Sequence, residues 1–187
     1  EDDLILISDV DEIPNLENID LKEYKEKIIQ FRQDMFHYKF NLKLPNFTWT
    51  GTKGCKKKNL INPQWLRNIK DKKYPFFRID TIFSKKKYYN IKFIDDGGWH
   101  FSYLKDPINV EKKLKSIRHH IEYDQNPLGV DKIDEMIKNK KLIYNYSADQ
   151  RTSNKFENNE TLGILETGKL PKYIQKNLEI FGDWLVK

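Results

Sequence analysis

The stretch Leu4-Ile5-Leu6-Ile7-Ser8-Asp9-Val10-Asp11 decides what fold to expect. Four consecutive apolar residues have the length of a buried strand, and two acids follow where that strand ends. In open α/β sheets ligands bind at the carboxyl ends of strands, so this placement favours a binding site. Because the chain opens on such a strand, we expect further sequence, with the strands of a nucleotide-binding half, to precede residue 1.

Apolar spacing over the rest of the chain predicts an α/β fold, a mixed sheet with flanking helices. Strands are expected at residues 36–44, 81–83 and 88–94. Helices are expected at residues 15–29, 110–121 and 133–137, and from Pro171 onwards. We expect one domain over 1–187, with the sheet in about 1–105 and a helical part in about 106–187.

The composition is typical of a folded domain with a basic surface. Aromatic residues make up 13% of the 187 residues, which argues against disorder although 33% are charged. The net charge of +6 suits anionic partners, but the lysines come in short runs typical of solvated loops. Arginines, which phosphate-reading surfaces favour, are few. We therefore expect no nucleic-acid partner, and a basic nucleic-acid-binding module is retained as an alternative.

Cysteine content and hydropathy bear on the compartment. Cys55 is the single cysteine, which fits a reducing environment and a structural role. No apolar run approaches the roughly 20 residues that cross a bilayer, so no membrane segment is expected in this chain. We expect a cytoplasmic location in a microbe or viral host, or a Golgi membrane if an anchor precedes residue 1. The sequence leaves the oligomeric state open.

The pair Asp9 and Asp11 is a candidate metal site. Just past a strand, two carboxylates two residues apart can converge on one hard cation if the backbone turns between them. A divalent ion there can bridge phosphate oxygens. Acid pairs after strands also serve as helix caps and turn formers, so the pair alone leaves both interpretations open.

A second strand is expected to end on Asp95-Asp96, directly before Gly97-Gly98-Trp99-His100-Phe101-Ser102-Tyr103. The glycines permit a tight backbone there. His100 can ligate a metal or, when protonated, bind diphosphate, although a histidine between aromatic residues is also typical of packing. Trp99 suits stacking on a sugar ring, or a place in the core.

The strings Ser8 to Pro14 and Gly97 to Tyr103 together resemble glycosyltransferase family 17. This is the family of the β-1,4-mannosyl-glycoprotein 4-β-N-acetylglucosaminyltransferase, which adds bisecting N-acetylglucosamine in N-linked glycosylation. Further agreement comes from Trp49-x-Gly51-Thr52, Pro63-Gln64-x-Leu66-Arg67 and Leu170-Pro171-Lys172-Tyr173-Ile174-x-x-Asn177. The resemblance spans nearly the whole chain, and the string ending at Tyr103 is its most specific element.

The resemblance implies a GT-A type fold and a metal-dependent, inverting glycosyltransferase. Such an enzyme moves N-acetylglucosamine or a similar sugar from a UDP-sugar donor to a hydroxyl of a glycan acceptor. It implies Mn²⁺ or Mg²⁺ at Asp9 and Asp11, with His100 as a further ligand. Arg67 and Trp99 are candidates for binding the donor, by pairing with phosphate and by stacking. A surface ion pair is the alternative for Arg67.

Inversion needs a general base that deprotonates the acceptor hydroxyl, and an Asp or Glu is the ordinary choice. The candidates are Asp96, Asp95 and Glu122, in that order. The first two end a strand beside the glycine turn, whereas Glu122 is expected on a helix. Each can equally be a solvated acid, and nothing in the sequence separates the two interpretations.

A phosphohydrolase of the haloacid-dehalogenase type is the main alternative. It too opens on an apolar strand ending in Asp-x-Asp, and Asp95-Asp96 would supply its later acidic pair for Mg²⁺. That motif requires Thr or Val two residues after the second Asp, where this chain has Ile13 followed by Pro14. The alternative also leaves the string from Gly97 to Tyr103 unexplained.

Overall fold

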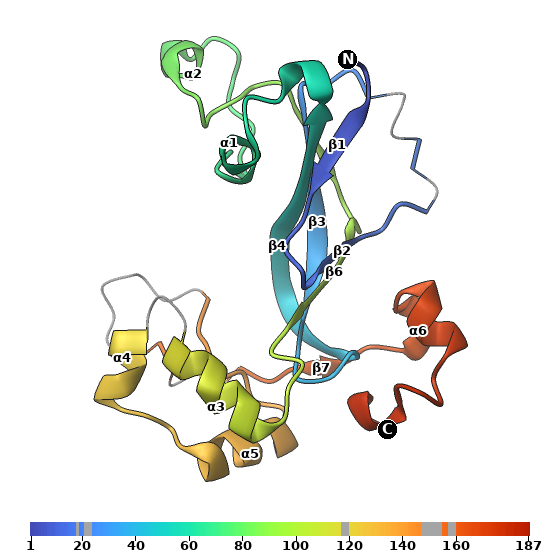
Figure 1. Cartoon of the computed structure of the whole chain (residues 1–187), viewed down its shortest axis with the longest axis vertical. Helices are drawn as coiled ribbons and strands as arrows, with labels where there is room; N and C mark the ends of the chain where they lie inside the picture. Colours follow the sequence, from blue (N-terminus) through green and yellow to red (C-terminus); the bar gives the residue numbers. More distant parts are fainter. Residues whose placement is uncertain (18, 21–23, 117–119, 147–154, 157–159) are drawn as a thin grey trace. The chain divides into compact units, whose positions relative to one another are not determined.

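The computed structural model describes residues 1–17, 19–20, 24–116, 120–146, 155–156 and 160–187 (Figure 1). These residues form two compact units. Unit 1 comprises Glu1–Asp34 and Thr48–His100, and unit 2 comprises Met35–Phe47 and Phe101–Lys187. The expectation of a single domain over 1–187, divided near residue 105, stays a prediction.

The strands form a mixed sheet, as the sequence predicts. Their order is β1-β4-β3-β6-β2, with β5 beside β3 and β7 beside β4. β3 and β5 are parallel, whereas β1 and β4, β2 and β6, and β4 and β7 are antiparallel. The strands are β1 (Leu4–Ile7), β2 (Glu12–Pro14), β3 (Ile28–His37), β4 (Leu42–Lys56), β5 (Ile91–Ile94), β6 (Gly98–Ser102) and β7 (Gly163–Ile164).

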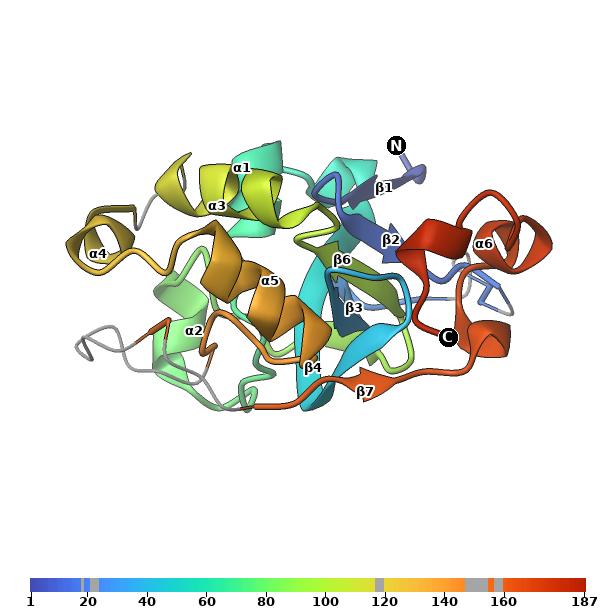
Figure 2. The same cartoon turned by 90° about the horizontal axis from the view of Figure 1, so that it is seen from below.

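Short helices flank the strands, which confirms the α/β class. The α-helices are α1 (Pro63–Arg67), α2 (Ile79–Phe83), α3 (Pro107–Ser116), α4 (His120–Gln125), α5 (Val130–Lys138) and α6 (Lys172–Lys176). Single 3₁₀ turns are η1 (Lys57–Asn59), η2 (Thr167–Lys169) and η3 (Gly182–Trp184). In unit 2, α3 packs against both α4 and α5 (Figure 2). Among the described residues, none of these helices has the length and apolarity to span a membrane.

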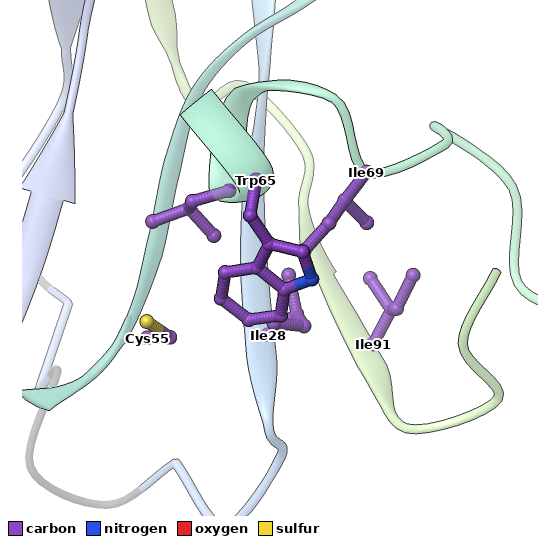
Figure 3. Packing of buried hydrophobic residues seen from close by; sticks show 6 residues of the cluster. Ile28, Cys55, Trp65, Ile69 and Ile91 are labelled. Atoms are coloured by element: carbon purple, nitrogen blue, oxygen red, sulfur yellow. The ribbon is translucent and has the colours of Figure 1, made fainter. Parts of the chain in front are cut away.

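The core of unit 1 lies where α1 covers the sheet. Trp65 of α1 packs over Ile28 of β3, with Cys55 of β4 and Ile91 of β5 beside it (Figure 3). The helix starts where Asn62 accepts a hydrogen bond from the Trp65 amide, with Pro63 at the first helical position. Burial raises the pKa of the Cys55 thiol, which fits its packing position.

Strand β1 forms where the sequence predicts, but it is half-buried and stands at one end of the strand order. The expectation of a buried strand is therefore wrong in its burial. Leu4 and Leu6 pack against one cluster of buried residues, whereas Ile7 packs against another. An apolar run on both faces is thus explained by two clusters, and a four-residue run cannot distinguish an end strand from a central one.

The helix expected over residues 15–29 is wrong. The described residues from Asn15 to Lys27 are not helical, and Ile28 begins β3. Ile19 and Tyr24 pack instead as irregular segments against the buried cluster that contains Ile29. Their spacing resembles that of a helix, but these residues are apolar because they pack against this cluster and not because they lie on one face of a helix.

The single strand expected over residues 36–44 is also wrong. β3 ends at His37, and β4 begins at Leu42 after a turn in which Tyr38 has a φ of 63°. The four turn residues keep the alternation in phase, which is why the pattern looks continuous. Within unit 2, Asn41 exchanges two hydrogen bonds of 2.8 Å with the Val186 backbone, which holds the turn.

The remaining expectations fare unevenly. Residues 81–83 belong to α2 rather than to a strand, and the strand expected at 88–94 narrows to β5. The helices around 110–121 and 133–137 are confirmed as α3, α4 and α5, although Ile117 lies outside the described residues. The helix after Pro171 ends within five residues, because Asn177 leaves the helical conformation.

Candidate functional site

The acids Asp9 and Asp11 lie on a tight turn between β1 and β2. The Glu12 amide donates a 3.0 Å hydrogen bond to the Asp9 carbonyl and closes the turn. The Asp9 amide donates in return to the Glu12 carboxylate, also at 3.0 Å. Val10 is fully exposed at the tip. The backbone therefore does turn between the two acids, as a shared cation requires.

Strand β2 brings this turn beside the second sequence string. It pairs antiparallel with β6, so that Glu12 faces His100, Ile13 faces Trp99 and Pro14 faces Gly98. Gly98 has a φ of +130°, and a Cβ there would lie 2.1 Å from the Ile13 carbonyl oxygen. Only glycine permits this close approach. Two strings about ninety residues apart in sequence are thus neighbouring strands in unit 1.

His100 faces the acidic turn from β6. Its Nε2 lies 3.5 Å from Oδ2 of Asp11, and its ring centre lies 5.0 Å from that of Trp49. The side chain is buried, and its Nδ1 has no hydrogen-bond partner among the described residues. A protonated His100 would pair with Asp11, and a neutral one offers nitrogen as a ligand.

The side chain of Glu12 connects the turn to β4. Its carboxylate is buried and accepts a 2.8 Å hydrogen bond from the indole nitrogen of Trp49 on β4. Gly51 makes room for it, because a Cβ at this position would lie 2.8 Å from Cδ of Glu12. Ser8, which follows β1, and Thr52 of β4 are joined through a 2.7 Å contact between their hydroxyls. The turn is thus fixed to β4 by hydrogen bonds on both sides of its acids.

Arg67, the last residue of α1, pairs with Asp9. Its guanidinium lies 2.7 Å from the Asp9 carboxylate, and both side chains are half-exposed. Beneath it, the Lys53 ammonium donates to the carbonyls of Arg67 and Ile69 at 2.9 Å and 2.6 Å. Burial lowers the pKa of Lys53, and these two carbonyls are its compensation. The arginine is therefore held in place by a buried lysine.

Part of this group of residues lines a small pocket of about 220 Å³, whereas Asp11 and His100 are not among its lining residues. Its lining includes Asp9, Glu12, Trp49, Gly51, Lys53 and Arg67. Two of the lining groups carry positive charge and two carry negative charge. The pocket is therefore suited to a polar, charged ligand rather than to an apolar one.

The fit to a metal ion depends on how many ligands the protein must supply. Among the described residues, no three His, Cys, Asp or Glu side chains are gathered closely enough to hold an ion. Asp11 and His100 face each other, whereas Asp9 is engaged by Arg67. Mg²⁺ is commonly held by one or two carboxylates together with substrate phosphates and water. The turn fits that kind of shared site, and the assignment of its three candidate ligands stays a prediction.

The other site candidates lie apart from this turn. Asp95 is largely exposed and pairs with Arg32 at 2.9 Å, while Asp96 adopts a φ of 50° in an exposed turn. Asp96 lies in the turn that precedes β6, four residues before His100. Trp99 is half-buried and points to the opposite face of β6 from His100, because side chains alternate along a strand.

Glu122 belongs to unit 2, where its carboxylate is bound by Lys155 at 2.6 Å and 2.7 Å. The Lys155 side chain is almost fully buried, so this ion pair has a structural explanation. The roles of Asp95, Asp96, Trp99 and Glu122 all stay predictions. The structure leaves each of them outside the pocket at the acidic turn.

Sequence reasoning missed Glu12 and Lys53 as parts of the site. Glu12 stands in the quoted string, but its partner Trp49 is 37 positions away, and no local pattern shows their contact. In the sequence, Lys53 resembles the many surface lysines, whereas in the structure its side chain is buried. No protein-family model matches this chain, and neither the curated proteins nor the solved structures contain a match to it. The site is therefore interpreted from its own geometry.

Proposed function

We propose that the chain is an inverting, metal-dependent glycosyltransferase of GT-A type and that the turn Asp9–Glu12 binds the diphosphate of a UDP-sugar. One observation carries the proposal. Four separate sequence strings of the family resemblance contribute to the surroundings of this one turn, through Asp9, Trp49, Arg67 and His100. A resemblance due to chance gives no reason for such strings to converge in space.

The chemistry needed at this turn is stabilisation of a leaving diphosphate. Mn²⁺ or Mg²⁺, when bound with the donor, supplies Lewis-acid stabilisation of the charge on the departing phosphates. Asp9 and Asp11 provide the hard oxygen ligands that such an ion prefers. Arg67 provides a guanidinium whose paired N–H groups match phosphate oxygens. Donor binding would then loosen the contact between Arg67 and Asp9.

Glu12 and Trp49 act as positioning residues in this proposal. The buried carboxylate holds the Asp9 amide and the Trp49 indole at the same time, so the turn keeps its shape when a ligand arrives. Trp49 also packs its ring near His100, which keeps that imidazole directed at Asp11. A preorganised turn of this kind loses little entropy on binding.

The general base is proposed among Asp96, Asp95 and Glu122. Asp96 remains the first candidate because it lies on the same strand connection as the His100 string and is exposed to an incoming acceptor. Asp95 and Glu122 are already held by cationic partners, Arg32 and Lys155. Trp99 is retained as a stacking residue for a sugar, on the other face of β6.

N-acetylglucosamine or a similar sugar is the proposed group transferred, and a glycan hydroxyl is the proposed acceptor. A cytoplasmic location is proposed with it, since a single cysteine, Cys55, fits a reducing compartment. The phosphohydrolase and nucleic-acid alternatives gain no specific support from the pocket, whose charges are mixed.

The proposal is tested by measuring UDP release from a panel of UDP-sugars, with Mn²⁺ or Mg²⁺ and oligosaccharide acceptors. We expect release from at least one donor to depend on acceptor and metal. Asp11→Ala should lower the rate by at least about 100-fold, since it removes a group proposed to stabilise the leaving diphosphate.

The matched control is Asp2→Ala, an exposed acid that precedes β1 and pairs with Lys56 and Lys58. It should leave the rate within about twofold. Release of phosphate from a simple phosphate ester, without UDP release from any donor, would overturn the proposal in favour of a phosphohydrolase. Equal rates for Asp11→Ala and the unchanged protein would overturn the role of the turn.

A further inference from the structure

Residues 70–87 form a long loop of unit 1, which we call the basic loop. At its base, the Lys70 amide donates to the Lys86 carbonyl at 2.9 Å, and the Tyr74 amide donates to the Tyr88 carbonyl at 3.2 Å. Lys73 and Tyr88 form an isolated parallel bridge. The two lysine-rich stretches, 70–73 and 85–87, therefore lie side by side. Between them the chain continues to α2, which Figure 1 shows at the end of the loop beyond α1.

The tip of the basic loop exposes large apolar side chains. Phe76, Phe77, Ile79 and Phe83 are 78%, 72%, 71% and 83% exposed. The rings of Phe76 and Phe77 contact each other at 5.7 Å between centres. Single exposed apolar residues are ordinary, but four within eight positions form a patch of the kind that marks an interaction site. Elsewhere among the described residues, no stretch of eight positions holds more than three such side chains.

The basic loop also carries most of the net charge of the protein. Residues 70–87 contain seven lysine and arginine residues and two aspartates. Their net charge is +5, and the net charge of the whole chain is +6. Most of the net positive charge of the chain is thus concentrated in the basic loop. Lys72, Lys73, Lys85 and Lys86 are all exposed.

The acid nearest the tip is neutralised within the loop. Arg78 donates two hydrogen bonds of 2.8 Å to Asp80, and Lys87 donates a third, also of 2.8 Å. Hydrogen bonding by these cations lowers the pKa of Asp80 to about 2. Asp80 therefore offers no uncompensated repulsion to an anionic partner.

We propose that the basic loop docks on the surface of an anionic lipid bilayer. Phe76, Phe77 and Phe83 would enter the boundary between headgroups and acyl chains, and the lysines of the loop base would contact lipid phosphates. An apolar tip with cations set behind it matches the order of layers in such a membrane, apolar inside and anionic outside. Unlike a spanning helix, the loop only lies on the membrane.

A nucleic-acid surface fits less well. Single-stranded nucleic acids are bound by aromatic residues interleaved with cations along a groove. Here the aromatic residues gather at the tip, the lysines gather at the base, and the one arginine is occupied by Asp80. The inference concerns a surface separate from the pocket at the acidic turn, and it does not rest on the proposed sugar transfer.

Vesicle co-sedimentation of the whole chain tests the proposal. We expect binding to phosphatidylcholine vesicles that contain phosphatidylserine, and little binding to phosphatidylcholine alone. The double variant Phe76→Ser/Phe77→Ser should lower the partition coefficient at least about tenfold, because it removes inserted apolar groups. Lys85→Gln/Lys86→Gln should lower it about tenfold at low salt and less at high salt.

Two control variants match these changes in chemistry. Ile121→Ser/Ile180→Ser removes two exposed apolar side chains elsewhere, and Lys112→Gln/Lys115→Gln removes two exposed charges from α3. Both should bind vesicles as the unchanged protein does. Because the substituted side chains are exposed, all four variants should fold. Thermal unfolding followed by circular dichroism checks this.

Several results would overturn the proposal. These are absence of binding to anionic vesicles, equal loss in the control variants, or retained binding in the phenylalanine variant. Self-association that depends on Phe76 and Phe77 and persists in the presence of vesicles would instead assign the tip to a second copy of the chain. Loss of vesicle binding on adding inorganic phosphate at constant ionic strength would indicate a site for a free anion.

Discussion

The turn Asp9–Glu12 and the turn that contains Asp95 and Asp96 both end a strand of unit 1 on acids, but their surroundings differ. In the first, Glu12 is buried and receives hydrogen bonds from Trp49 and from the Asp9 amide. In the second, Asp95 exposes 75% of its side chain beside Arg32. An acid pair thus becomes a candidate site through neighbours on distant strands, and without them it remains a surface turn.

The largest expected effect is a loss of stability when a side chain is added at Gly51, next to the first turn. In Gly51→Ala the new Cβ would meet Oε1 of Gln33 at 2.0 Å and Cδ of Glu12 at 2.8 Å. Both side chains are buried and hydrogen-bonded, so they can move aside only by losing those bonds. We expect the free energy of unfolding, measured by urea denaturation, to fall by about 3 kcal/mol. Gly168→Ala, where a Cβ meets nothing within 4 Å, should change it by less than about 0.5 kcal/mol.

The second prediction compares one acid from each turn. Glu12→Ala leaves the Trp49 indole and the Asp9 amide without their acceptor, and should lower the free energy of unfolding by about 2 kcal/mol. Asp95→Ala breaks only an exposed ion pair and should cost less than about 0.5 kcal/mol. Equal losses in the two variants, measured by the same denaturation, would contradict the distinction between the turns.

The third prediction compares the arginine that each turn holds. Arg67→Ala should raise the KM for a UDP-sugar about tenfold, since the proposed phosphate contact is lost. Arg32→Ala, which removes the partner of Asp95, should leave KM within about twofold. Steady-state kinetics of UDP release measures both. A similar rise in the two variants would mean that net charge, rather than the first turn, governs donor binding.

The smallest expected effect concerns pH. Burial lowers the pKa of Lys53, so above that pKa the unfolded chain holds the proton that the folded chain has released. The free energy of unfolding therefore gains a contribution that rises with pH, up to the ordinary lysine pKa of about 10.4. Urea denaturation between about pH 8 and 10 should show this contribution reduced in Lys53→Met and unchanged in Lys112→Met. Parallel profiles for Lys53→Met and the unchanged protein would contradict it.

The sequence predicted the elements whose pattern is local. The apolar run at Leu4–Ile7 gave a strand, and the helical spacing around Ile133 gave α5. It failed where two elements share one pattern, as in the alternation that continues across the turn from Tyr38 to Asn41. It failed also at residues 15–27, where tertiary packing of Ile19 and Tyr24 imitates helical spacing.

The candidate site was only partly predictable for the same reason. Asp9, Asp11 and His100 could be named from strings of residues, but the pairing of β2 with β6 that joins them is a non-local event. Glu12 became visible only through its contact with Trp49 on β4. The concentration of positive charge in residues 70–87 could have been counted from sequence, whereas its exposed apolar tip could not.

The central claim is tested most directly by titrating UDP into the protein by calorimetry, with and without Mn²⁺. The turn Asp9–Glu12 predicts that Mn²⁺ strengthens UDP binding, that Asp11→Asn removes this gain, and that Asp96→Asn keeps it. This comparison needs no acceptor and no turnover. If Asp11→Asn keeps the full Mn²⁺-dependent gain, or if Asp96→Asn alone loses it, the donor site does not lie at the first turn.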